Sequence, residues 1–203
     1  QSVGNSSNFY ASHTHKVILS GDQLQTISFA NPGSSRINDL EITNTSVAGI
    51  VFATQSSVKG ALTAHNNNVS GDLSGFTLAS NSILTGDITI SHDSIFLNEN
   101  TLTINGNLTQ TGGSNYLDGG RLIVTGDYAI TGSSRLRMED VNDYLLVNGD
   151  FSTASDVSHG SASYYLDAGV FELKGDFTQS VGNSSNFYAS HTHKVILSGD
   201  QLQ

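Results

Sequence analysis

A short phrase, in which aliphatic and polar residues alternate before a glycine, recurs along the whole chain. Successive copies read VILSGDQ, SILTGDI, LTINGNL, LIVTGDY, LLVNGDF and FELKGDF, and VILSGDQ then returns. The glycines are Gly21, Gly86, Gly106, Gly126, Gly149, Gly175 and Gly199, and weaker copies at Asn44 and Gly60 fill the one long gap. These pivots divide 178 residues into eight units of about 22 residues. A period of about 20–50 residues indicates a solenoid or an array of small units.

Alignment of the units on their pivots gives one strictly aliphatic column, two residues before the pivot. Its members are Leu19, Ile42, Val58, Leu84, Ile104, Val124, Val147, Leu173 and Leu197. The next residue is polar in every unit. This alternation is typical of a β-strand with one buried face. The glycine is expected to let the backbone turn a corner after the strand.

Each unit contains more than one strand. Residues 107–126, for example, divide into NLTQ, a TGGS turn, NYLD, a GG turn and RLIVTG. Three short strands and three turns make one triangular coil. The sequence therefore predicts an all-β fold, a parallel, three-sided β-solenoid with about 22 residues per coil and about eight coils per 178-residue repeat. A string of β-sandwiches is the alternative, but it does not keep one aliphatic column in register with repeated corners.

A longer repeat encloses these units, because residues 1–25 reappear letter for letter as residues 179–203. We interpret 1–178 as one full tandem repeat of a continuous solenoid and 179–203 as the start of the next. The natural sequence is then expected to continue after Gln203 close to TISFANPGSS, as it does after Gln25.

Charge and hydropathy argue against two classes of partner. The net charge is −10 with only eight Lys and Arg, whereas binding to a phosphate backbone needs basic patches, so no nucleic acid is expected. No apolar run approaches the ~20 residues of a membrane-spanning helix, so no membrane insertion is expected in this segment.

Two sets of residues are candidates for metal binding. Asp or Asn follows the pivot in seven units, and a solenoid would align Asp127, Asp150 and Asp176 along one corner, where carboxylates can bind Ca²⁺. His13 and His15 lie on the same side of a strand end and recur as His191 and His193. A zinc site would need further ligands. We favour turn roles for both sets, since Asp and Asn satisfy backbone N–H groups in turns, and we expect no cofactor.

Catalysis is not expected from the distribution of charged side chains. Glycan-active sites need clustered carboxylates in a groove. The richest acidic patch, MEDVND, contains Glu139, Asp140 and Asp143 beside Arg135 and Arg137, and we expect it to form a solvated ion-pair cluster. Tyrosine rings can stack on sugars, and the candidates are Tyr10, Tyr116, Tyr144 and Tyr164. Strand alternation is expected to turn several of these four inward.

The phrases NGNLTQTGG, GGRLIVTGDY and HKVILSGDQLQTISF resemble repeat regions of long bacterial cell-surface proteins, the adhesin-like β-solenoids of the filamentous haemagglutinin type. The resemblance implies an extracellular, cell-surface location and a structural or adhesive segment of an extended stalk or fibre that is not an enzyme. Its expected partners are neighbouring repeats of the same chain or head-to-tail copies. The alternative is a glycan- or cell-wall-binding module whose partner is a surface glycan, and a polysaccharide-active enzyme is less favoured.

Overall fold

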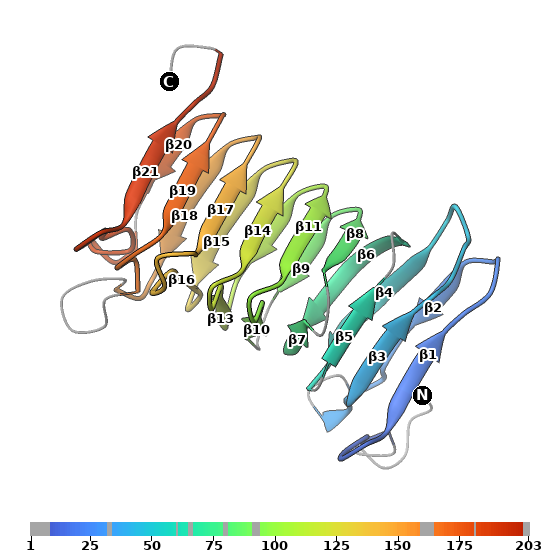
Figure 1. Ribbon diagram of the computed structural model, residues 1–203. Helices are drawn as coiled ribbons and strands as arrows, with labels where there is room; N and C mark the ends of the chain where they lie inside the picture. The colour runs from blue at the N-terminus through green and yellow to red at the C-terminus, as the bar shows by residue number, and fades with distance from the viewer. Residues whose placement is uncertain are drawn as a thin grey trace.

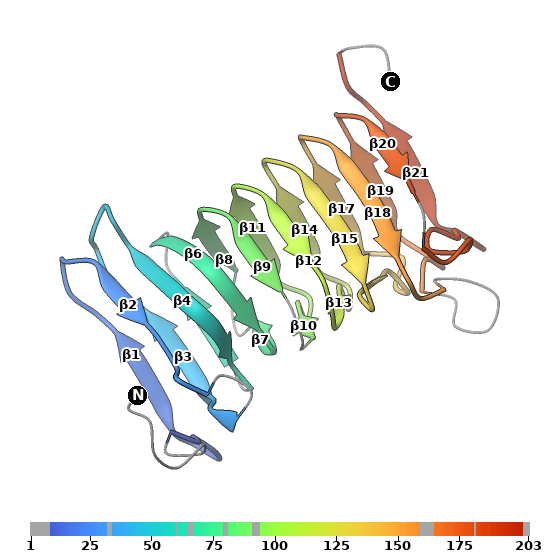
Figure 2. The ribbon, with the colours of Figure 1, turned by 180° about the vertical axis from the view of Figure 1, so that it is seen from behind.

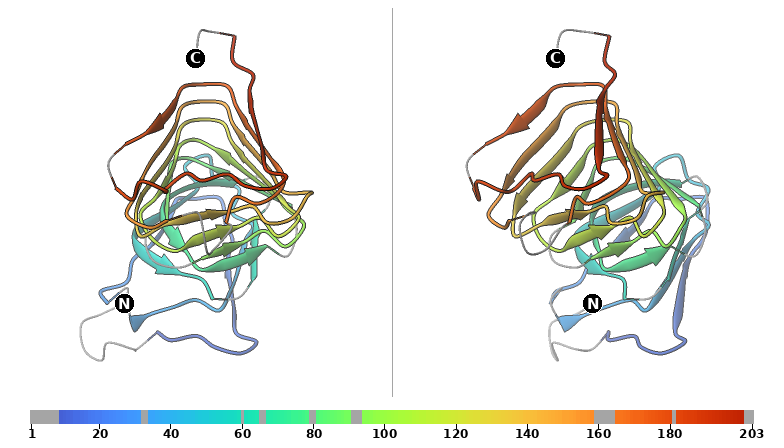
Figure 3. Two further views of the ribbon diagram at one scale, coloured as in Figure 1. Left: turned by 90° about the vertical axis from the view of Figure 1, so that its left-hand side faces the viewer. Right: turned by 60° about the vertical axis from the view of Figure 1, so that its left-hand side comes forward.

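The computed structural model is a parallel β-solenoid, as the repeat predicts (Figures 1 and 2). It describes residues 9–31, 34–59, 61–64, 67–78, 81–90, 94–158, 165–180 and 182–200. Every strand pairing within these ranges is parallel, and no α-helix occurs in them. Seen near its long axis, the molecule is a stack of coils around a common interior (Figure 3).

The strands form three faces. Face 1 is a seven-stranded sheet of β1 (Lys16–Leu19), β3 (Asp39–Ile42), β5 (Ala61–Ala64), β7 (Phe76–Leu78), β10 (Ile95–Phe96), β13 (Ser114–Tyr116) and β16 (Arg135–Arg137). Face 2 contains β2 (Gln25–Ile27), β4 (Ile50–Ser57), β6 (Asn67–Ser74), β9 (Ile88–Ile90), β12 (Leu108–Gln110), β15 (Tyr128–Gly132), β18 (Phe151–Ser155) and β20 (Phe177–Gln179). Face 3 contains β8 (Ser82–Thr85), β11 (Thr101–Asn105), β14 (Arg121–Val124), β17 (Tyr144–Val147), β19 (Val170–Leu173) and β21 (Lys194–Leu197). Faces 2 and 3 join through β6 into one 14-stranded sheet.

The aliphatic column lies in the core, which confirms the inward face that the alternation predicts. All seven members between the end coils are fully buried, namely Ile42, Val58, Leu84, Ile104, Val124, Val147 and Leu173. The two members in the end coils differ, because Leu19 is half-buried and Leu197 is 56% exposed. An end coil lacks a neighbour on one side, so the same side chain loses part of its cover there.

Coil length varies while register is maintained. Thr101 pairs with Arg121, twenty residues on, whereas Arg121 pairs with Tyr144 and Tyr144 with Val170, at steps of twenty-three and twenty-six. The side chains of β11, β14, β17 and β19 nevertheless stay aligned. The additional residues are therefore accommodated in the turns.

The predicted unit at Gly60 aligns Val58 with Ile42, and this alignment is wrong. Gly60 itself lies outside the described residues. Ile42 pairs with Ala64, twenty-two residues on, while Val58 forms a bridge with Ile37. The next step is short, since Leu62 pairs with Leu78 only sixteen residues later. After this short coil the repeat phrase lies on another face, since β8 pairs on face 3 whereas β1 and β3 pair on face 1. As a result β1 and β21, which have the same sequence, lie in different sheets.

Substitution of the column by a carboxylate tests the inward assignment. We expect Val124→Asp and Leu173→Asp to cost several kcal/mol, because each buries an unpaired charge among aliphatic side chains. Thr125→Asp, one residue from Val124, should cost little because Thr125 is exposed. Urea unfolding followed by circular dichroism measures the difference, and equal tolerance of the two classes of variant would show that the assignment is wrong.

Candidate functional site

The carboxylates that the sequence marks as candidate calcium ligands form a hydrogen-bonded ladder along one corner. Oδ1 of Asp127 accepts the backbone N–H of Asp150 at 2.8 Å, and Oδ1 of Asp150 accepts that of Asp176 at the same distance. The series begins earlier, where Asp87 and Asn107 accept the N–H groups of Asn107 and Asp127, again at 2.8 Å. We call these five residues the corner ladder. Each of its first four side chains caps a backbone N–H group of the next coil.

The corner ladder explains why glycine precedes these residues. A Cβ added to Gly149 would lie far inside van der Waals contact with Oδ1 of Asp127. Gly126 and Gly175 stand in the same relation to Asn107 and Asp150. The backbone of these three glycines is not left-handed, unlike that of Gly86 with φ of 114°. The chain does bend at these glycines, but without a left-handed backbone, and close approach between coils is what requires glycine there.

The paired histidines contact the preceding coil separately. His191 contacts the Asp167 carboxylate, while Nδ1 of His193 donates to the Ala168 carbonyl at 2.9 Å. Burial lowers the pKa of His193. In the first copy, Nδ1 of His13 lies 3.0 Å from Oγ of Ser12. Across the described ranges, no group of three or more His, Cys, Asp or Glu is placed to hold a metal ion.

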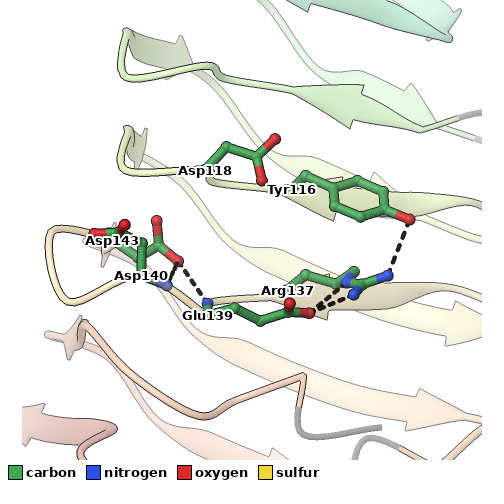
Figure 4. Close-up of a pocket in the computed structure, with 6 residues that line it drawn as sticks. All are labelled: Tyr116, Asp118, Arg137, Glu139, Asp140 and Asp143. Carbon is green, nitrogen blue, oxygen red and sulfur yellow. Dashed lines mark hydrogen bonds and ion pairs between the residues drawn. The ribbon is translucent and has the colours of Figure 1, made fainter.

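The MEDVND patch borders an open pocket of about 350 Å³ (Figure 4). Its lining residues are Tyr116, Asp118, Arg137, Glu139, Asp140 and Asp143. Glu139 pairs with Arg137 at 2.6 Å, which confirms one ion pair of the expected cluster. Arg135 is not among the lining residues, and its guanidinium lies 5.6 Å from the centre of the Tyr165 ring.

Asp143 is buried, so the expectation of a solvated side chain is wrong for this residue. Its Oδ1 accepts the N–H of Gly119 at 2.7 Å, and its Oδ2 accepts those of Glu139 and Asp140 at 2.7 and 2.9 Å. Burial raises the pKa of this carboxyl group, while the three N–H donors oppose that rise. Asp143 therefore ties its own turn to the preceding coil.

Aromatic and arginine side chains stack along the outside of face 1. Phe96 and Tyr116 are parallel with ring centroids 4.5 Å apart, and the Arg137 guanidinium lies 4.5 Å from the Tyr116 ring and 4.6 Å from the Tyr165 ring. Strand order places Phe96 and Arg137 on opposite sides of Tyr116. Both faces of this ring are therefore covered, and neither is free for a sugar.

The expected inward orientation is wrong for three of the four tyrosines. Tyr10 is 56% exposed, and Tyr116 and Tyr144 are half-buried on the outer surface. Tyr10 and Tyr144 stack with Arg36 and Arg121 at 3.9 and 4.1 Å. Tyr164 lies outside the described residues. Stacking with arginine from a neighbouring coil covers these rings without burying the hydroxyl group.

A buried polar cluster in the core was missed by the sequence analysis. The Tyr128 hydroxyl donates to Oε1 of Gln110 at 2.7 Å, and the Asn115 amide donates to both at 2.7 and 3.0 Å. Burial raises the pKa of Tyr128. A signal was present, because Gln110 occupies a position held by isoleucine in both neighbouring coils, Ile90 and Ile130.

Substitution of Asp127 tests the hydrogen bonds of the corner ladder. Asp127→Ala should cost about 0.5–1.5 kcal/mol, because the N–H of Asp150 loses its acceptor at an exposed corner. Asp127→Asn should cost much less, since Asn107 already fills the same role with an amide oxygen. Urea unfolding measures both variants. A loss as large in the asparagine variant as in the alanine variant would show that charge, for instance in ion binding, matters more than the hydrogen bond.

Two findings concern the chain as a whole and not a single site. None of the described residues belongs to a helix long and apolar enough to cross a membrane. Comparison with known protein families, curated proteins and solved structures finds no match to this chain.

Proposed function

We propose that this chain is a structural segment of an extended extracellular rod at a cell surface, a stalk or fibre that presents or builds adhesive structures. The observation that carries the proposal is the C-terminal coil. β21 has the sequence of β1 and stacks in parallel register on β19, with Val170 opposite Lys194 and Leu173 opposite Leu197. A coil that begins a second copy of the sequence thus adds to the stack by the same rule as the coils before it.

The contacts between coils suit a mechanical role. Backbone ladders on three faces, the corner ladder and the column of Phe96, Tyr116, Arg137 and Tyr165 all run along the solenoid axis. Such a solenoid is stabilised by nearest-neighbour terms, so added coils lengthen it without changing its cross-section. The net charge of −10 favours separation of neighbouring rods through mutual repulsion.

Groups that an enzyme would use are engaged in the structure of the turns. Asp143 accepts three backbone N–H groups, Glu139 is paired with Arg137, and Asp140 accepts the N–H of Asn142. This engagement supports a non-enzymatic role. The resemblance to adhesin-like repeats supports the proposed location.

Glycan binding is the second candidate, and the open pocket of Figure 4 is the observation that favours it. Asp118, Asp140 and the Tyr116 hydroxyl could accept hydrogen bonds from sugar hydroxyl groups. The covered faces of Tyr116 remove the usual stacking contribution, so the rod remains our first proposal.

Length measurement tests the rod. A chain extended to two 178-residue periods should be longer by ~38 Å, because about eight coils add ~4.8 Å each, while the cross-sectional radius stays the same. Small-angle X-ray scattering measures both quantities. A more globular particle with a larger cross-section would contradict the proposal.

A glycan array run on the same protein separates the two candidates. The rod predicts no saturable binding. Saturable binding that is lost in Asp140→Ala, but kept in the matched variant Asp150→Asn on the corner ladder, would assign the pocket to glycans instead.

A further inference from the structure

Glycine follows Asn or Asp at three places in the chain, and such pairs are prone to form a succinimide ring. The pairs are Asn105 with Gly106, Asn148 with Gly149 and Asp118 with Gly119. Glycine has no side chain to hinder attack of its backbone nitrogen on the preceding side-chain carbonyl carbon. The nitrogen must also lose its proton, so a hydrogen bond from its N–H group to a fixed acceptor slows the reaction. The three glycine N–H groups therefore decide which pair reacts.

Two of these glycine N–H groups are held by a neighbouring coil. The N–H of Gly149 donates to the Gly126 carbonyl at 3.0 Å. The N–H of Gly119 donates to Oδ1 of Asp143, which is buried, at 2.7 Å. At both places the nitrogen can react only after a contact between coils has been broken.

Gly106 differs from the other two glycines. No hydrogen bond from its N–H group is found among the described residues. The preceding coil accounts for this, because Gly86 has a left-handed φ of 114° and its N–H donates to the Asn105 carbonyl at 3.0 Å. The bond between these two coils thus runs in the opposite direction from the one that holds Gly149. Asn105 is exposed at the end of β11, where water reaches its side chain.

We propose that Asn105 is a site of spontaneous deamidation in the folded chain, whereas Asn148 and Asp118 are protected. The deprotonated nitrogen of Gly106 attacks Cγ of Asn105 and closes a succinimide ring. The Cγ–Nδ2 bond breaks, and Nδ2 takes up the proton and leaves as ammonia. Water then opens the ring at either carbonyl, which gives aspartate or isoaspartate at this position. The reaction consumes one water molecule, releases one ammonia molecule and needs no enzyme or oxidant.

The modification falls within the corner ladder. Asp87 caps the N–H of Asn107, and Asn107 caps the N–H of Asp127, both at 2.8 Å. Isoaspartate places an additional main-chain carbon just before Gly106, where even a Cβ would lie far inside van der Waals contact with the Gly86 carbonyl oxygen. The corner has no room for this atom. Isoaspartate should therefore displace Asn107 and lose both hydrogen bonds.

This inference goes beyond the proposed function and does not depend on it. The reaction follows from the chemistry of one corner, whether or not the chain forms a rod. In a long-lived molecule it would loosen the contact between coils at one defined place as the molecule ages.

Peptide mass spectrometry of the full chain, incubated at neutral and at mildly alkaline pH, measures the three pairs side by side. Asn105 should deamidate about threefold to tenfold faster than Asn148, which is the effect of one hydrogen bond on an activated step. The rate at Asn105 should rise with pH, because hydroxide removes the proton from the Gly106 nitrogen.

Two controls separate protection by the fold from intrinsic reactivity. In urea the two asparagines lie in nearly identical local sequences, ING and VNG, so their rates should become equal. Asn105→Gln should stop the reaction at this position, because glutamine would have to close a larger ring, and should leave the fold intact because the side chain is exposed. Aged wild-type chains should unfold at a lower urea concentration than fresh ones, and aged Asn105→Gln chains should not.

Either of two results would overturn the proposal. If Asn148 reacts as fast as Asn105 in the folded chain, the hydrogen bond of Gly149 gives no protection. If Asn105 reacts only in urea, the end of β11 holds its side chain away from the Gly106 nitrogen.

Discussion

The structure depends on in-register contact between successive coils, and the corner is where this contact is closest. A carboxylate or amide oxygen of one coil caps a backbone N–H of the next, as Asp127 does for Asp150. The space for it exists only because Gly149 has no side chain. Glycine and the following Asp therefore act together across two coils, and shifting a strand by one residue would lose the hydrogen bond and expose the aliphatic column.

The same contact explains why the solenoid tolerates insertions in its turns and why a very short coil changes its strand pairing. Steps of twenty, twenty-three and twenty-six residues all keep face 3 aligned, because the additional residues are accommodated in turns. The sixteen-residue step from Leu62 to Leu78 is a short circuit of face 1, and there β6 pairs with β8 of face 3 as well as with β4 and β9 of face 2. This rule supports the proposed structural role, since coils of matching register can be added along the axis.

The sequence predicts the architecture because one period runs through the chain. Its aliphatic column is buried in the structure, for example at Ile104, Val124 and Val147. The pattern misplaced the unit at Gly60 because a single chain does not show which aliphatic residues stack when coil length changes. It did not indicate the close approach between coils at Gly126, Gly149 and Gly175, because that approach involves residues about twenty positions away. The expectation that several tyrosines turn inward does not hold for Tyr116, because alternation alone does not indicate that Arg137 of the next coil covers this ring on the outer surface.

Amide hydrogen exchange at the corner tests the central claim most directly. The N–H groups of Asn107, Asp127, Asp150 and Asp176 belong to exposed residues, yet each donates to a side chain of the preceding coil. The account predicts that these four amides exchange as slowly as those of the strands β11, β14 and β17. Exchange at the rate of an exposed turn amide such as that of Val141 would contradict it, because the coils would then be held by their strands alone.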